Sequence, residues 1–288
     1  MDFQFVTPFV EYEFMQRALV GSIAVCLGAV PTGVFMALRR MSLTGDAMAH
    51  AILPGAAVAY LVTGMSLVGL SFGGLVAGLI VAMLAGWVAR ITDSKEDSSL
   101  ASFCIISLAL GVLVISLKDS NIDLFHVLFG NILSLDNTAL WLLSSICTIS
   151  LFIFSWLFRP LVIECVDPQF LRRTSRSSSI AHLGFLFLMV LNLVAGFHAL
   201  GTLMAIGIMI LPAAAARFWA RTIDGVLVTA ILLGVICSYA GLVLSFNFDV
   251  PAGPAIVLSL GSTYVVSLFF GTNGGLVEKR LPRRHLTG

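Results

Sequence analysis

Charge is scarce in this sequence: only 11% of its 288 residues are Asp, Glu, Lys or Arg, against about 25% in a typical soluble domain. Hydrophobic residues make up 59% of the chain, and the net charge is only +1. This composition excludes a soluble enzyme with one membrane anchor, a disordered protein and a nucleic-acid-binding protein. The sequence therefore predicts an integral membrane protein.

The signatures of several other protein classes are also missing. The five cysteines show no CxxC spacing, so no disulfide framework is indicated. No GxxxxGK[ST] phosphate-binding loop occurs, so any ATP hydrolysis has to come from another chain. No Gly/Ser-rich or Pro-rich linker divides the chain, which predicts a single membrane domain over residues 1–288.

Apolar runs of about 20 residues, the length that crosses a bilayer as a helix, recur along the whole chain. We expect an all-α polytopic membrane protein with about nine transmembrane helices, or eight, since only residues 197–200 separate the sixth and seventh. An amphipathic stretch around residues 124–135 predicts a short surface or re-entrant helix. The expected spans are residues 15–38, 45–63, 67–89, 100–117, 138–158, 180–197, 200–216, 225–246 and 252–271.

Basic residues gather on alternate loops between these spans. Of the 16 lysine and arginine residues, all but Arg17 and Lys118 fall on one side of the expected membrane. By the positive-inside rule, the N-terminus is outside and the C-terminus is cytoplasmic, which requires an odd number of spans. The residues on the cytoplasmic side are Arg39, Arg40, Arg90, Lys95, Arg159, Arg172, Arg173, Arg176, Arg217, Arg221, Lys279, Arg280, Arg283 and Arg284.

Asp46 and His50 are ionisable residues inside the second expected span. A charged side chain at the centre of a bilayer costs about 2.5–3.5 kcal/mol, so such a residue points to function. Four residues apart, the two share one helix face, and a carboxylate with an imidazole can bind Zn²⁺ or Mn²⁺. The small residues around them predict a thin helix, and Pro54 predicts a kink or a free carbonyl oxygen. An internal ion pair or an N-terminal helix cap is the structural alternative.

Other residues are weaker candidates. His198, at the expected outer turn, is either a metal ligand where the ion enters or a polar cap. Met204 and Met209 offer thioether ligands, although methionine in an apolar helix usually serves packing. Residues 69–73 fit GxSxG, the nucleophile pattern of α/β hydrolases, with Ser71 at its centre, but the strand-to-helix context is missing.

The segment SLTGDAMAHAILPG, residues 42–55, resembles a signature of the manganese/zinc/iron permease family of bacterial ABC importers. Residues 200–204 followed by 210–217 are similar to the family's second signature, and residues 128–133 are similar to its mid-chain segment. The likeness in length, number of spans and lack of an ATPase domain extends over essentially the whole chain.

This resemblance implies an ABC importer permease fold and a homodimer in the lipid of the bacterial plasma membrane. It implies two copies of a separate cytoplasmic ATPase as partners and an extracytoplasmic protein that delivers the metal. Asp46 and His50 occupy the family's acidic and histidine positions and would line the metal path. The cargo would be manganese, zinc or iron, with no covalently bound cofactor and no catalytic role for this chain.

Residues 164–178 are expected to form a short cytoplasmic helix that docks into the ATPase. They are the longest internal polar stretch on the basic side, and Asp167 can cap a helix there. Phe170 and Leu171 would supply an apolar knob for the interface. The alternative is a basic loop that only fixes topology. Leu171 and Ser175 replace the Ala and Gly that are common in the family at these positions.

Two other function classes stay open on the residues alone. A self-contained secondary transporter would use Asp46 and His50 for protons and metal, and would depend on a proton gradient without any ATPase. An intramembrane hydrolase would use Ser71 and react with serine-directed probes. An adjacent gene for a P-loop ATPase would favour the importer over both.

Overall fold

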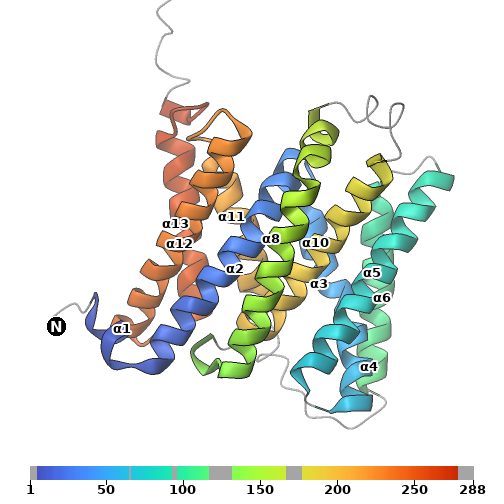
Figure 1. Cartoon of the computed structure of the whole chain (residues 1–288), viewed down its shortest axis with the longest axis horizontal. Coiled ribbons are helices and arrows are strands. Elements are labelled where there is room, and N and C mark those ends of the chain that lie inside the picture. Colours follow the sequence, from blue (N-terminus) through green and yellow to red (C-terminus); the bar gives the residue numbers. More distant parts are fainter. Residues whose placement is uncertain (1–4, 65, 93–95, 117–131, 167–176, 278–288) are drawn as a thin grey trace, which may run out of the picture.

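The structure is a computed structural model, and it describes residues 5–64, 66–92, 96–116, 132–166 and 177–277. Within these residues every regular element is a helix, and the long helices run side by side with a common tilt (Figure 1). In chain order they are α1 (Thr7–Glu11), α2 (Glu13–Leu38), α3 (Ser42–Ala51), α4 (Leu53–Thr63), α5 (Leu67–Ile91), α6 (Glu96–Ser116), the 3₁₀ helix η1 (Ile132–Ser134), α8 (Asn137–Val166), α10 (Ser177–Leu200), α11 (Thr202–Ala216), α12 (Ile223–Phe248) and α13 (Ala252–Phe270).

Each of the nine expected spans coincides with helical structure. Seven helical segments in the described residues are long and apolar enough to cross a membrane. Two shorter apolar stretches, Ser98–Leu113 in α6 and Thr202–Ala216 in α11, correspond to the remaining two expected spans. The second span is divided between α3 and α4, which together form the segment Thr44–Thr63. The prediction of an all-α polytopic membrane protein is therefore confirmed.

Two boundaries differ from the expected ones. The turn after the sixth span lies at Gly201, whose φ of 81° favours glycine, so α10 continues through residues 197–200. Helix α8 runs past Pro160 to Val166 instead of ending at residue 158. Proline removes one backbone hydrogen bond, but Leu157 and Leu161 are buried on either side of it, and this packing keeps the helix continuous.

The amphipathic stretch before α8 is described only at its end. Residues 117–131 lie outside the described residues, so the surface or re-entrant helix stays a prediction there. Ile132 and Leu135 are buried, and the Leu135 side chain packs against Gly21 of α2. The end of this segment is therefore fixed against the bundle.

Helix α2 forms the centre of the bundle. In its most apolar window 78% of the residues are buried, against 22% for α8 and α13. Helices α11, α12 and α13 lie on one side of it and α4, α5 and α6 on the other, with α8 and α10 between (Figure 1). This arrangement surrounds α2 with protein and leaves the outer helices to face lipid.

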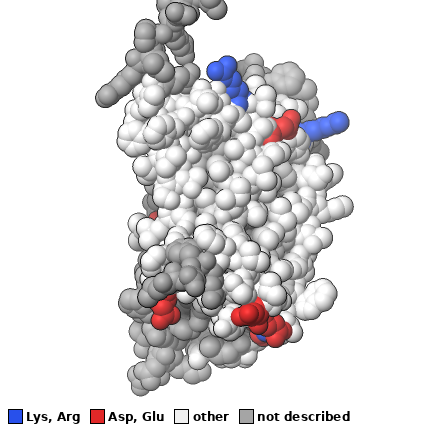
Figure 2. Space-filling model, turned by 90° about the vertical axis from the view of Figure 1, so that its left-hand side faces the viewer, with Lys and Arg blue, Asp and Glu red and all other residues white. Residues whose placement is uncertain are grey.

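Charge is segregated along the bundle axis. On the face that Figure 2 shows, Lys and Arg appear mainly at the upper end, and the broad middle band is almost free of charge. Such a band is what a bilayer core requires. Helix α2 begins at the lower end of the bundle and α13 finishes at the upper end, as an odd number of crossings requires (Figure 1).

Candidate functional site

Helix α3 follows α2 after a sharp turn. Arg40 adopts a left-handed conformation with φ of 60°, and the Met41 amide donates to the Met36 carbonyl, which reverses the chain. Gly45 then packs against the terminal methyl groups of Met36 in α2 and Met209 in α11. Because Gly45 has no side chain, α3 lies close against both helices.

Asp46 and His50 lie one helical turn apart on α3. Asp46 is exposed and His50 is half-buried, whereas Met48, Ala49 and Ala51 of the same helix are buried. The helix therefore turns its carboxylate outward and its apolar side chains inward. This is the reverse of what lipid would favour for a membrane segment.

Neither structural alternative for this pair appears in the described residues. The N-cap of α3 is Met41, without a side-chain hydrogen bond, so Asp46 does not cap the helix. No ion pair joins Asp46 to His50 within the described part of the chain, where the two ion pairs are Arg17–Glu13 and Arg39–Glu164. The carboxylate and the imidazole are thus available to a ligand.

The break between α3 and α4 is covered by α6. The Ser107 hydroxyl donates a hydrogen bond of 3.1 Å to the Ala51 carbonyl oxygen, and Gly111 lies against Pro54. The kink predicted at Pro54 is present as a break at Ile52 between the two helices. The Ala51 carbonyl oxygen at this break is therefore not free, because a neighbouring helix supplies its hydrogen-bond donor.

The thin-helix prediction for this region is also confirmed. Gly55 of α4 and Gly73 of α5 bring their backbones so close that a Cβ atom on either would overlap the other's carbonyl oxygen. Small residues allow this close crossing inside a membrane. The contact fixes α4, and with it the second half of the second span, against α5.

The remaining candidates are placed as follows. His198 belongs to the last turn of α10 rather than to a separate turn, and its side chain is not among those described. Met204 and Met209 are buried, and Met209 packs against Gly45, which fits the packing role. Asp167, Phe170 and Leu171 lie outside the described residues.

Ser71 lies in the second turn of α5 and is buried. The GxSxG pattern therefore lies within one long helix rather than at a turn from strand to helix. A nucleophile elbow depends on that turn for the exposure of its serine. The hydrolase alternative thus lacks its structural basis.

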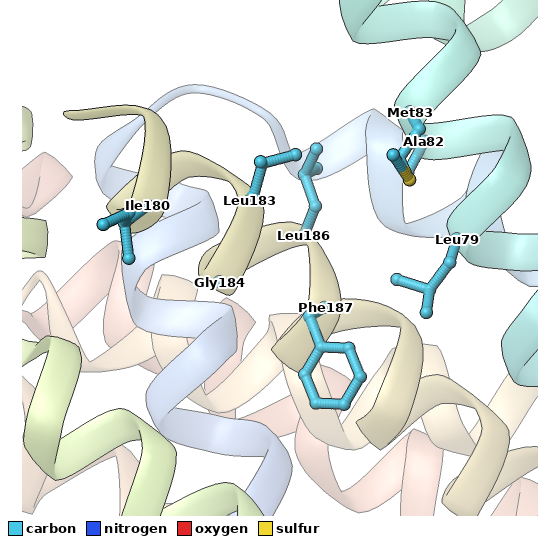
Figure 3. Close-up of a pocket in the computed structure, with 8 residues that line it drawn as sticks. All are labelled: Leu79, Ala82, Met83, Ile180, Leu183, Gly184, Leu186 and Phe187. Atoms are coloured by element: carbon cyan, nitrogen blue, oxygen red, sulfur yellow. The ribbon is translucent and has the colours of Figure 1, made fainter. Parts of the chain in front are cut away.

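Metal ligands in the described residues are sparse. No group of three or more His, Cys, Asp or Glu side chains in that part of the chain could hold an ion. A pocket of 380 Å³ between α5 and α10 is lined by Gly184 and apolar side chains, among them the thioether of Met83 (Figure 3). Asp46 and His50 supply only two such side chains, so within the described residues of one protomer they do not form a group of this size.

Two polar clusters were not singled out from the sequence. Arg39 and Glu164 form an ion pair near the ends of α2 and α8. The Asn192 amide of α10 donates to Ser150 of α8 at 2.8 Å and lies 3.5 Å from the hydroxyl of Thr32 in α2. Asn192 could have been noticed as a polar residue in an apolar span, whereas the pairing of Arg39 requires the fold.

Comparison with known proteins gives consistent matches. A family model described as the ABC 3 transport family matches residues 11–271. The manganese transport system membrane protein MntC of Halalkalibacterium halodurans is 31% identical, over 96% of this chain and 93% of that protein. The chelated iron transport system membrane protein YfeD of Yersinia pestis is 31% identical, over 94% of this chain and 90% of that protein. The solved structure of PsaBC from Streptococcus pneumoniae in complex with Fab matches with a TM-score of 0.83 and 29% identity, over 96% of this chain and 99% of that one.

Proposed function

This chain belongs to the ABC 3 transport family, and from this premise we propose that it is the membrane-spanning permease of an ATP-driven importer for a divalent transition metal, with manganese as the first candidate. The chain acts as a transport component and hydrolyses no ATP itself. The metal is its cargo, and we assign no covalently bound cofactor. Its place is the plasma membrane, with the C-terminus in the cytoplasm.

The observation that carries the proposal is the outward-facing Asp46–His50 pair. Asp46 is exposed on the surface of one protomer within the apolar segment Thr44–Thr63. A carboxylate in contact with lipid would cost about 2.5–3.5 kcal/mol near the bilayer centre. A position that faces water or another protein surface avoids this cost. A second copy of the chain meets this need, so we infer a homodimer with the metal path between the two α3 helices.

The ligand chemistry suits several metals. A carboxylate and an imidazole bind Mn²⁺, Fe²⁺ and Zn²⁺, and selectivity depends on geometry and on which metal is delivered. The similar proteins are named for manganese and for chelated iron. Manganese is therefore preferred for this chain, iron follows, and zinc rests on the ligand chemistry alone. His198 is retained as a ligand where the ion enters from outside.

Two partners complete the importer. A cytoplasmic ATP-binding subunit docks on residues 164–178, with Asp167, Phe170 and Leu171 in the contact, and an extracytoplasmic protein delivers the metal. The described helices are consistent with this position, because α8 ends at Val166 and α10 begins at Ser177, both at the upper end of the bundle (Figure 1). By the positive-inside rule the upper end faces the cytoplasm, since α2 ends there before Arg39 and Arg40.

The test is uptake of radioactive Mn²⁺ by cells that contain the complete importer. We expect Asp46→Ala and His50→Ala each to abolish uptake, and the double variant to be no worse than either, because residues that act as a unit are not additive. Asp224→Ala is the matched control, since Asp224 is an exposed carboxylate in the first turn of α12. Wild-type uptake by a well-expressed Asp46→Ala variant would show that the pair is not on the metal path.

A further inference from the structure

Three helices meet at an ion pair that is largely buried. Arg39, directly after α2, donates from Nη2 to Oε2 of Glu164 in the last turn of α8 at 2.6 Å. The two side chains are only 9% and 10% exposed. The guanidinium lies over the Phe185 ring of α10, with Cζ 4.3 Å from the ring centroid.

Stability alone does not account for this arrangement. Burying two charges carries a large desolvation cost, and apolar residues of similar size are often as stable or more so. Arg39 Nε is buried and has no hydrogen-bond partner among the described residues, which adds to the cost. The other ion pair in the described part of the chain, Arg17–Glu13, is local to α2 and partly exposed. The Arg39–Glu164 pair therefore differs from Arg17–Glu13 in its desolvation cost and in joining two residues far apart in the chain.

Its position connects the two parts of the proposed transporter. Glu164 lies two residues before the end of α8, where the chain enters residues 167–176, the core of the proposed docking segment. Arg39 lies three residues before α3, which carries Asp46 and His50. The tight turn at Arg40 lies between Arg39 and α3, and its left-handed conformation is costly for a residue with a Cβ atom. A shift of Glu164 would thus be passed through Arg39 to the start of α3.

We propose that Arg39 and Glu164 are positioning residues that transmit movement of the ATPase docking segment to α3 and its metal-binding pair. This rests on the proposed function. A charged hydrogen bond is directional and holds two specific atoms together, whereas apolar contact is not directional and lets surfaces slide. The ion pair therefore transmits a displacement from α8 to α2 that simple packing would lose.

The test uses the complete importer in proteoliposomes, with Mn²⁺ uptake and ATP hydrolysis measured in the same sample. We expect Glu164→Gln to lower the number of Mn²⁺ ions moved per ATP by at least about fivefold, a usual size for coupling between sites, while hydrolysis continues. The double variant Arg39→Met/Glu164→Leu removes both charges together. It should unfold at the wild-type temperature or above, yet show the same loss of coupling. The control is Arg17→Gln/Glu13→Gln, which should transport like wild type.

The outcomes separate the two proposals. Failure of the wild-type complex to move Mn²⁺ at the expense of ATP would overturn the proposed function itself. The other adverse result requires that the wild-type complex transports Mn²⁺. If the Arg39→Met/Glu164→Leu variant then folds and keeps its full ratio of Mn²⁺ to ATP, the transmission role is overturned and the pair is a structural contact. An uncoupled double variant of normal thermal stability supports the proposal, because the loss of coupling could not then be attributed to a loss of stability.

Discussion

Gly33 offers the sharpest test of the packing that positions α3. A Cβ atom at Gly33 of α2 would overlap the backbone carbonyl oxygen of Met209 in α11. A backbone atom inside a helix cannot turn away as a flexible side chain can, so Gly33→Ala has to push the two helices apart. Met209 also contacts Gly45 of α3, so this displacement reaches the helix of Asp46 and His50.

The magnitude follows from two opposing effects. Extra atoms in a well-packed core cost about 1–3 kcal/mol, and the rigid obstacle places Gly33→Ala in the upper part of that range. Alanine in a helix regains about 0.5–1 kcal/mol relative to glycine. The net expectation is a loss of about 1–2.5 kcal/mol, which lowers the unfolding temperature by several degrees. Mn²⁺ uptake should fall as well.

Thermal unfolding in detergent, followed by uptake measurements, checks this prediction. Gly86→Ala and Gly261→Ala are matched controls, because both glycines lie inside helices and, apart from the neighbouring backbone of the same helix, no atom lies within 4 Å of the added carbon. These two variants should be unchanged or more stable by about 0.5–1 kcal/mol. If Gly33→Ala were as stable and as active as the controls, the close approach of α2 and α11 would be wrong.

Three further predictions concern polar contacts, docking and topology. Asn192→Leu should lower the free energy of unfolding by about 0.6–1.7 kcal/mol, the range from the average to the largest contribution of a hydrogen bond between membrane helices; an unchanged unfolding temperature would contradict its link to Ser150. Phe170→Asp/Leu171→Asp should release the ATP-binding subunit without preventing membrane insertion; if that subunit still co-purifies and uptake persists, docking uses another loop. In a cysteine-free background, a cysteine at Ser175 should react with an impermeant maleimide only from the cytoplasm and one at Asp249 only from outside; labelling of both from one side would reject the orientation.

The sequence alone determined the class of protein, the spans and the spacing of Asp46 and His50. Hydropathy and positive charge are properties of local composition, so they located all nine segments without knowledge of any contact. The separation of Asp46 and His50 by four residues fixes them on one face of whatever helix contains them. Local signals failed only where packing or a single glycine sets a boundary, as at Pro160 and Gly201.

Only the tertiary structure decided which faces meet. The long spans have no marked polar face, and the two ionisable residues of α3 do not tell which neighbours it packs against or which helix covers the break at Pro54. Two contacts join segments far apart in the chain: the hydrogen bond from Ser107 to Ala51 and the ion pair of Arg39 with Glu164. The exposure of Asp46 likewise depends on which helices pack beside α3. Such contacts depend on which helices become neighbours. In a membrane, burial of apolar surface does not distinguish one helix face from another, so side-chain shape and close glycine crossings decide which helices pack together.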